Sequence, residues 1–383
     1  MTGIVPTRTE VAHLTRLTVR DFRNLARVDL DLPAAGIALV GDNGHGKTNL
    51  LEAVYYLHHF RSLRGAREPE LVRFGAGGFH VAAALRGAAA DSVSAGFEAA
   101  SGRRRVVLDG VPCERLSDAL GVLPAVAFAP ADVNMVAGPP ADRRHYLDLL
   151  LASSSRRYLG ALRDYRAALA QRNAALRAGA GRAQAAAWEP SLAGHGAVLR
   201  VERAAFVDWA RPRLQEIGIA LGERLPVGLR YRSTVTIEGD ATDDRARDAI
   251  AAAMHESRDR DMERGLTHPG PHRDDLDLRL GDASLRRYGS AGQQRSAAIA
   301  LRLLECAWSR ERAGREPVLL LDDPVAELDP GRAERVLDLL TARPAGQVLL
   351  AVPRADDVPA RLASLARCAV RDGVVTPMEV SDG

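Results

Sequence analysis

The sequence predicts an α/β protein in which a sheet domain with a glycine-rich loop carries a subdomain of antiparallel strands and an inserted helical hairpin lobe. Three observations predict it. A buried-strand pattern at residues 37–40 leads directly into a glycine-rich loop at residues 41–48. Apolar and polar residues alternate in short runs through residues 79–108, as is typical of antiparallel strands. An apolar stripe at helical spacing runs through residues 158–176.

The glycine-rich loop has the form G-x-x-x-x-G-K-T and is interpreted as a phosphate-binding loop. Residues 49–56 follow it as an expected helix, so a bound phosphate would meet the N-terminus of that helix. Backbone N–H groups are expected to cradle the β-phosphate of a nucleotide, Lys47 to reach the β- and γ-phosphates, and Thr48 to ligate Mg²⁺. The predicted nucleotide-binding residues are Gly41, Asp42, Asn43, Gly44, His45, Gly46, Lys47 and Thr48.

Lys47 is also the only lysine of the chain. All the other residues among the 52 lysines and arginines are arginine. A composition so biased towards arginine keeps a lysine only where a fork-shaped guanidinium does not serve. A compact ammonium enclosed by a tight loop is such a place. The amino-acid usage therefore supports nucleotide binding independently of the motif.

The composition is that of an ordinary globular protein of 383 residues, with 46% hydrophobic and 26% charged residues. A net charge of +3 means that a nucleic-acid surface would have to come from local arginine clusters. With 4% aromatic residues, base stacking is not expected to dominate such binding. The three cysteines are too far apart for a C-x-x-C metal pair or a disulfide framework. Neither a membrane span nor a signal peptide is recognised, so a cytoplasmic location without membrane contact is expected.

The first part of the chain predicts a strand-rich domain. Two strands flank the segment 21–26, and the second leads towards the phosphate loop. A turn at Asp109-Gly110 follows three antiparallel strands. The strands are expected at residues 14–20, 27–32, 79–86, 92–98, 103–108 and 125–128.

From about residue 141 the pattern becomes helical. A first long helix is indicated by Tyr158, Leu162, Tyr165, Leu169 and Leu176, and a second by residues 185–221. Later strands are expected at residues 227–238, 276–280, 317–321 and, as the last, 347–352. The predicted division is therefore an N-terminal part of the ATPase domain at 1–140, a mainly helical insertion at 141–265 and a C-terminal part of the ATPase domain at 266–383.

The apolar run at 317–321 ends in two acidic residues, as a phosphate-loop ATPase requires opposite its loop. Asp322 would hold Mg²⁺ through its water shell, and Asp323 would orient or deprotonate the attacking water. Lys47 and Asp323 are thus the predicted catalytic residues. The alternative is a solvated acidic turn after a core strand.

Two further strings resemble known motifs. Gly289-Ser290-Ala291-Gly292-Gln293 resembles the signature motif of the ABC-type ATPases, and residues 326–329 resemble their dimer-contacting loop. The resemblance implies an ABC-type ATPase head in which Ser290, Gly292 and Gln293 cap the γ-phosphate of ATP held by a second subunit. ATP would then lie between the two chains of an ATP-dependent homodimer.

The more specific resemblance is to the RecF family of bacterial recombination ATPases. It rests on ordered strings spread from about residue 14 to 350: Phe22-Arg23-Asn24, 138–144, 171–173, 271–276, 288–295 and 319–329. It implies slow ATP hydrolysis used as a switch, binding of single-stranded and of gapped or junction double-stranded DNA, and cooperation with RecR and RecO in loading RecA.

Two departures from the expected pattern stand out. Residues 351–353 contain neither a threonine run nor a switch histidine, so no γ-phosphate sensor is named there. No glutamine occurs between Asn49 and Ala170, and Asp132 or Asn134 are the candidate substitutes for the glutamine that links the two lobes of ABC proteins.

Other clusters leave alternatives open. Arg61, Arg64 and Arg67 form either a solvated face or a patch that contacts DNA phosphates. Arg143 and Arg144 either cap the helical lobe or bind DNA. A metal site at His268, His272 and the Asp274-Asp275 pair is less favoured, because Pro269, Gly270 and Pro271 interrupt helical spacing.

Two other functions share some of these motifs. The motor subunit of an ABC transporter is the alternative function, although transporters usually place glutamate where Asp323 stands. A coiled-coil chromosome ATPase is disfavoured because an insertion of only about 80 residues is too short for long arms.

Overall fold

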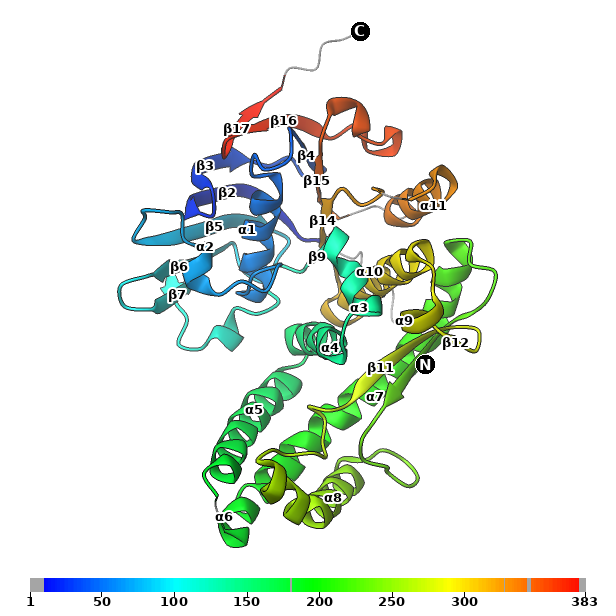
Figure 1. Ribbon diagram of the computed structural model, residues 1–383. Coiled ribbons are helices and arrows are strands. Elements are labelled where there is room, and N and C mark those ends of the chain that lie inside the picture. The colour runs from blue at the N-terminus through cyan, green and yellow to red at the C-terminus, as the bar shows by residue number, and fades with distance from the viewer. Residues whose placement is uncertain (1–9, 180, 327, 343–345, 379–383) are drawn as a thin grey trace, which may run out of the picture. The chain divides into compact units, whose positions relative to one another are not determined.

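The computed structural model describes residues 10–179, 181–326, 328–342 and 346–378 (Figure 1). The chain divides into two compact units. Unit 1 combines the chain up to Asp132 with Ala220–Gly222 and the chain from Ile299 onward. Unit 2 comprises Val133–Ile219 and Glu223–Ala298. The chain thus enters unit 2 between Asp132 and Val133, whereas the sequence-based division placed its boundaries at 140 and 265.

Unit 1 contains a six-stranded, largely parallel sheet in the order β17-β16-β4-β15-β14-β9. Its central strands are buried on both faces, which explains their unbroken apolar sequences. The carboxyl ends of β4 and β14 open towards the phosphate loop and the acidic pair, respectively. The strands are β4 (Gly36–Val40), β9 (Ala125–Phe128), β14 (Val318–Asp322), β15 (Val348–Val352), β16 (Ala366–Arg371) and β17 (Val374–Pro377).

A second six-stranded sheet of unit 1 is antiparallel, in the order β3-β2-β5-β6-β7-β8. Buried and less buried residues alternate along β5 and β6, so one face of the sheet joins the core. The strands are β2 (His13–Phe22), β3 (Leu25–Asp31), β5 (Gly78–Arg86), β6 (Ser92–Glu98), β7 (Arg103–Leu108) and β8 (Val111–Pro112).

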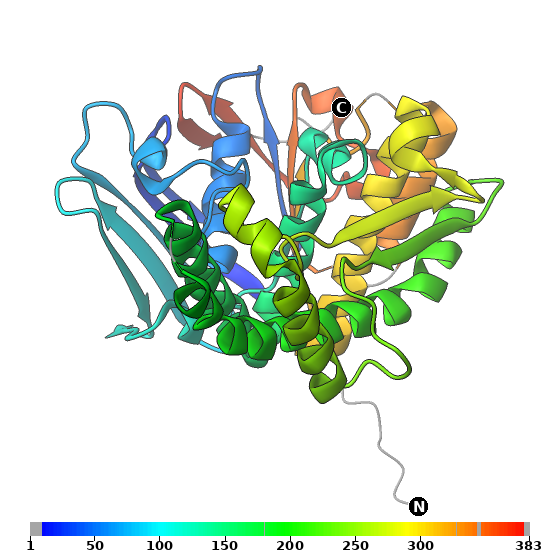
Figure 2. The same ribbon diagram turned by 60° about the horizontal axis from the view of Figure 1, so that its bottom comes forward.

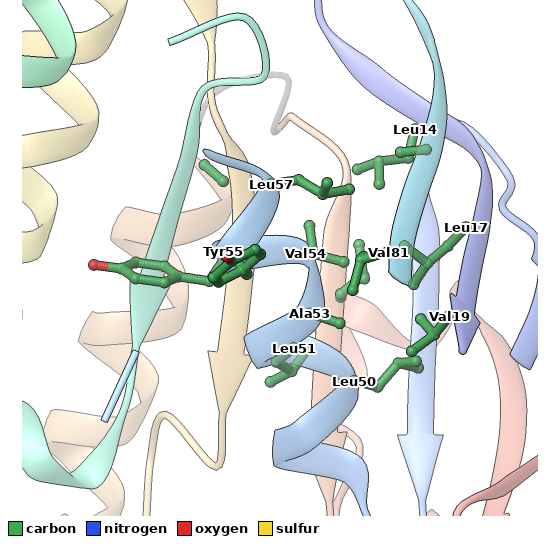
Figure 3. Close-up of a cluster of buried hydrophobic side chains, with 14 of the residues drawn as sticks. Leu14, Leu17, Val19, Leu50, Leu51, Ala53, Val54, Tyr55, Leu57 and Val81 are labelled. Carbon is green, nitrogen blue, oxygen red and sulfur yellow. The ribbon is translucent and has the colours of Figure 1, made fainter. Parts of the chain in front are cut away.

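Helix α1 (Lys47–His59) lies between the two sheets of unit 1 and contacts strands of both. Figure 3 shows Leu50, Val54 and Leu57 of this helix beside Leu14 and Val81 of the antiparallel sheet. Each such fully buried side chain contributes about 1.5–3 kcal/mol. The helix that begins at the phosphate loop is therefore anchored in the core.

The remaining elements of unit 1 are short, apart from two helices. Helix α10 (Ala291–Ala313) begins in unit 2 and ends in unit 1, and α11 (Pro330–Thr341) follows β14. The short elements are β1 (Glu10–Val11), α2 (Glu68–Leu71), η1 (Leu116–Asp118), η2 (Pro130–Val133), β13 (Arg315–Glu316), η3 (Ala355–Asp357) and η4 (Ala360–Leu362).

Unit 2 consists of long helices and a small three-stranded sheet. In Figure 2, the green strand β10 lies beside the yellow strand β11, with which it pairs in antiparallel register. The elements are α3 (Asn134–Ala137), α4 (Pro140–Ser154), α5 (Arg156–Arg177), α6 (Arg182–Ala186), α7 (Glu189–Ala220), β10 (Val227–Arg232), α8 (Asp243–Arg264), β11 (Asp275–Leu280), β12 (Ala283–Ser284) and α9 (Leu285–Tyr288).

The interior of unit 2 combines an apolar stripe with buried arginines. Four of the five residues of the predicted stripe on α5 are buried, namely Tyr158, Leu162, Tyr165 and Leu176, whereas Leu169 is only partly buried. Arg203 donates to the Asp148 carboxylate at 2.7 Å and to the carbonyl of Pro271. Such buried charges persist only when each is paired and hydrogen-bonded.

Two strand predictions are wrong. The strand expected over 227–238 ends at Arg232, because the Asp274 carboxylate accepts hydrogen bonds from the Thr234 N–H and the Ser233 hydroxyl and turns the chain. The strand at 347–352 is not the last one, since β16 and β17 follow it. The Asp372-Gly373 pair between them is a hairpin-turn signal that was available in the sequence.

The long second helix also differs from its prediction. Residues 182–186 form the separate helix α6, and α7 begins at Glu189 rather than at residue 185. No helix within the described residues combines the length and the apolar character that a membrane crossing needs.

Candidate nucleotide site

The phosphate loop joins the end of β4 to the first turn of α1. Gly46 is the N-cap of α1 and has a φ of 110°, a left-handed conformation that favours glycine. A Cβ at Gly46 would lie 2.8 Å from the side-chain oxygen of Asn24. Asn24 in turn accepts a 2.7 Å hydrogen bond from the Asn49 side chain. The turn at Phe22-Arg23-Asn24 therefore closes one side of the loop.

Lys47 lies inside the loop and is 7% exposed. Its ammonium donates to the carbonyls of Gly41 and Asp42, the latter at 2.9 Å. Burial lowers the pKa of Lys47, and the nearby charges of Asp322 and Asp42 oppose that effect. These loop carbonyls hold the ammonium beside the backbone N–H groups that would receive an anion.

Thr48 and Asp322 meet although they are 274 residues apart in the chain. The Thr48 hydroxyl lies 3.0 Å from both carboxylate oxygens of Asp322 at the end of β14. Burial raises the pKa of Asp322, while the Thr48 hydrogen bond and the Lys47 charge lower it. One hydroxyl and one carboxylate fit Mg²⁺, which keeps several waters and binds few protein ligands.

Asp323 leaves the strand in a different direction. Its φ is 49°, a left-handed conformation that aspartate adopts more readily than most residues. Its N–H donates to the carbonyl of Ala351 at 3.0 Å. The Asp323 charge acts on the pKa of both Lys47 and Asp322, so this carboxylate belongs to the same group of charges.

Glu52 is a buried carboxylate of the site to which the sequence analysis gave no role. It is fully buried on α1 and binds Arg23 at 2.9 Å, Arg64 at 2.6 Å and Ser62 at 2.5 Å. Burial alone would raise the pKa of Glu52, but these hydrogen bonds outweigh it and lower the pKa. An acidic residue inside an otherwise apolar helix was the signal that could have found it.

The three clustered arginines have different environments. The Arg64 side chain, 44% exposed, is bound to Glu52 and Asn49. Arg67 is 85% exposed on its side chain and pairs with Glu70 at 3.2 Å. Arg61 is exposed. Arg64 is therefore part of the loop's support, whereas Arg61 and Arg67 are exposed residues.

The signature residues lie in unit 2 at the N-terminus of α10. The Ser290 N–H donates to the Gln293 side-chain oxygen at 2.9 Å, and the Gln293 N–H donates to the Ser290 hydroxyl at 3.2 Å. This reciprocal capping fixes an exposed helix start, with Gly292 in its first turn. In the dimer-loop string, Glu327 lies outside the described residues, and Asp329 caps α11.

The structure also places the residues considered for the missing lobe-linking glutamine and for the missing γ-phosphate sensor. Asp132, the last residue of unit 1 before the chain enters unit 2, binds the Arg302 guanidinium at 2.6 Å and accepts the Ala129 N–H at 2.9 Å. Asn134 begins α3. Ala351 and Val352 are buried in β15, where Ala351 pairs with Asp322. Neither residue offers a polar side chain towards a γ-phosphate.

The alternative metal site is not formed. His268 binds Asp261 at 2.6 Å, and His272 binds the Tyr165 hydroxyl at 2.6 Å. In the part of the chain that the structure describes, no group of histidine, cysteine or acidic residues is placed to hold a metal ion. These residues instead link the helices of unit 2 to its turns.

Arg143 was considered either for a structural role at the start of the helical lobe or for DNA binding, and its contacts are structural. It is 2% exposed, binds Asp275 at 2.7 and 3.0 Å, and donates to the carbonyl of Gly138. Arg144 donates to the carbonyl of Asp274 at 2.8 Å. Both arginines therefore fix the start of α4 to β11.

Comparison with known proteins places this geometry in a family. A family model described as the RecF/RecN/SMC N-terminal domain matches residues 13–359. A relative from Anaeromyxobacter dehalogenans, named DNA replication and repair protein RecF, is 40% identical over 370 residues, which are 95% of this chain and 99% of that protein. A protein of the same name from Frankia alni is 41% identical over 366 residues, 91% of this chain and 96% of the relative. The chain belongs to the RecF family.

Solved structures agree with the RecF assignment. A recombination mediator protein of the RecFOR pathway, solved as RecF-ATP, has a TM-score of 0.88 at 26% identity and covers 97% of this chain and 98% of that one. An Smc head bound to the C-winged helix domain of ScpA, with a TM-score of 0.53 at 16% identity, shares the fold. The chain is thus a DNA replication and repair protein of RecF type with an ATPase-head fold, and the transporter alternative is not favoured.

Proposed function

We propose that this RecF protein is an ATP-dependent switch that binds DNA. The proposal rests on one observation. The Thr48 hydroxyl donates a 3.0 Å hydrogen bond to the Asp322 carboxylate beside the buried Lys47. This is the arrangement that a nucleotide bound with Mg²⁺ requires. The relative solved with ATP supports the choice of nucleotide.

Different residues of the site would bind the phosphates, hold Mg²⁺ and activate water. The loop N–H groups and Lys47 would bind the β- and γ-phosphates, while Thr48 directly and Asp322 through water would hold Mg²⁺. A bound Mg²⁺ would neutralise phosphate charge during hydrolysis. Asp323 would orient the attacking water or accept its proton.

Ser290, Gly292 and Gln293 would complete the site from a second chain. Ser290 is exposed at the start of a 23-residue helix, whose N-terminus favours anions. ATP would then join two chains into a homodimer, and hydrolysis would release them. Slow turnover suits such a switch better than a motor.

DNA in gapped or junction form would be the ligand of the closed dimer. Arg61 and Arg67 are the proposed phosphate contacts, because both are exposed residues of unit 1. The solved RecF relatives are recombination mediators of the RecFOR pathway, which supports RecO and RecR as partners in loading RecA. A cytoplasmic location follows from these partners.

The test compares wild-type protein with Lys47→Arg. Gel filtration with ATP and Mg²⁺, with and without gapped duplex DNA, should move the wild type from monomer to dimer. Lys47→Arg keeps the charge, but a guanidinium does not fit among the carbonyls of Gly41 and Asp42, so ATP binding should be lost while the fold remains. Wild-type affinity of Lys47→Arg for ATP would contradict the proposed site.

A further inference from the structure

The C-terminal hairpin touches the phosphate loop directly. Its turn, Asp372-Gly373, lies between β16 and β17, and β16 runs parallel to β4. The end of β16 therefore emerges beside the start of the loop. The Gly373 N–H donates to the carbonyl of His45 at 2.9 Å, across more than 300 residues of sequence.

Side-chain contacts reinforce this backbone bond. The Asp372 N–H lies 3.0 Å from Nδ1 of His45, and an Asp372 carboxylate oxygen lies 3.1 Å from the same nitrogen. A neutral His45 accepts from the N–H, and a protonated His45 donates to the carboxylate. The link between the loop and the hairpin therefore persists in either protonation state.

Two close backbone approaches leave no room for a side chain between the hairpin and the loop. A Cβ at Gly373 would lie 2.3 Å from the carbonyl oxygen of Asn24, on the turn that closes the other side of the loop. A Cβ at Gly41 would lie 2.3 Å from the carbonyl oxygen of Val370, the second residue before Asp372. The hairpin thus packs against the beginning, the end and the neighbouring turn of the loop.

We propose that the Asp372-Gly373 turn is a positioning element of the nucleotide site, which holds the loop ready for phosphate. In a planar trans peptide the C=O and the following N–H point in opposite directions. Because the His45 carbonyl is bound to the hairpin, the Gly46 N–H points away from it, towards the side where the loop would receive phosphate. The inference rests on the proposed nucleotide binding and adds residues that no loop motif contains.

Gly373→Ala is the direct test, and Gly102→Ala is its matched control. Both glycines lie in hairpin turns of unit 1 with left-handed φ values, 79° at Gly373 and 64° at Gly102, so both substitutions carry the same backbone strain. A Cβ at Gly102 would meet nothing within 4 Å. Only Gly373→Ala displaces the turn from the loop.

We expect Gly373→Ala to weaken ATP and ADP binding by about tenfold or more, and Gly102→Ala to leave both affinities within about twofold. The KM for ATP should rise while kcat stays near the wild-type value, because Asp323 is not displaced. In a His45→Leu background, Gly373→Ala should cost less affinity, since that background already lacks the contacts of the imidazole with Asp372. Equal ATP affinity of the two glycine variants would overturn the proposal.

A measurement on the wild-type protein covers the case in which Gly373→Ala does not fold. Hydrogen exchange should show that ATP with Mg²⁺ slows exchange of the amides at 371–374, while the hairpin at Gly102 is unaffected. No change at 371–374 despite ATP binding would refute the positioning role. Absence of ATP binding by the wild type would instead refute the proposed function.

Discussion

Asp322 and Asp323 are adjacent residues for which we propose separate roles, because the backbone turns between them. Asp322 ends β14 and faces Thr48, whereas Asp323 has the left-handed φ of 49°. Asparagine also tolerates this conformation, so Asp323→Asn should preserve the backbone.

We expect Asp323→Asn to bind ATP and Mg²⁺ through Asp322 and to hydrolyse ATP about 10²–10⁴-fold more slowly. The variant should remain a dimer for longer after ATP is added, as gel filtration would show. Asp322→Asn is the control and should weaken Mg²⁺-dependent binding itself. Normal turnover by Asp323→Asn would assign the water-orienting role to another carboxylate.

Two histidines are expected to make both units sensitive to acid. His58 is buried on α1 in unit 1, and His272 is partly buried in unit 2 against Tyr165. Burial lowers the pKa of each imidazole from 6.5 to about 4. Between these two pH values the unfolded chain therefore binds protons that the folded units do not. The contribution of the two neutral histidines to the free energy of unfolding is complete above about pH 6.5 and is lost as the pH falls towards about 4.

Urea unfolding measured between pH 7.5 and 4 should show this loss, with up to about 3 kcal/mol from each histidine. The pH slope for unit 1 should shrink in His58→Gln, and that for unit 2 in His272→Gln. An unchanged slope in either variant would mean that the imidazole concerned is protonated in the folded protein as readily as in the unfolded chain.

At the scale of elements, α1 and the segment after it combine support of the site with a candidate DNA surface. Glu52 holds Arg64 and Arg23 against the helix, while Arg67 stays 85% exposed on its side chain. Substitution of Arg64 should therefore affect mainly the stability of the fold, whereas substitution of Arg61 and Arg67 should affect mainly DNA binding.

Replacing Arg61 and Arg67 together with alanine should weaken duplex binding and flatten the plot of log K against log salt by up to about two units. Arg64→Ala should instead lower stability by roughly 1–3 kcal/mol, because buried Glu52 loses a partner. Arg354→Ala, at another exposed arginine of unit 1, is the control. If the salt dependence of DNA binding stays at the wild-type value, Arg61 and Arg67 are ordinary solvated residues and do not contact DNA phosphates.

At the scale of the whole molecule, the proposed site needs two chains. Ser290→Arg should spare ATP binding by the monomer but block dimerisation, because a bulky cation would occupy the place of the γ-phosphate cap. Loss of a charge-assisted cap costs roughly 1.5–3 kcal/mol at each site, and symmetry doubles it. Ser284→Arg, at an N-cap without a side-chain hydrogen bond, is the matched control.

Mixing Ser290→Arg with Lys47→Ala chains provides the decisive measurement. Each mixed dimer keeps one site with both its lysine and its serine, while the other site lacks both. ATPase activity should therefore partly return on mixing, whereas either variant alone stays inactive. Normal ATP-dependent dimerisation of Ser290→Arg would exclude the shared site.

The sequence by itself determined the parts of this protein whose residues are neighbours in the chain. The strand, loop and helix at 37–59 follow from glycine positions and apolar periodicity, and the capping of α10 by Ser290 and Gln293 spans three residues. Such local bonds depend on φ, ψ and side-chain reach within a few residues, so the pattern alone specifies them.

Only the tertiary structure decided which distant residues meet. Thr48 binds Asp322 across 274 residues, Asp132 binds Arg302 across 170, and the Asp372 N–H reaches His45 across 327. The sequence placed Asp322 near the loop by motif, yet it gave no role to Glu52 and no strand to the C-terminal hairpin. These contacts exist because the strand order of a parallel sheet brings the ends of β4, β14 and β16 to one edge, and packing rather than local pattern sets that order.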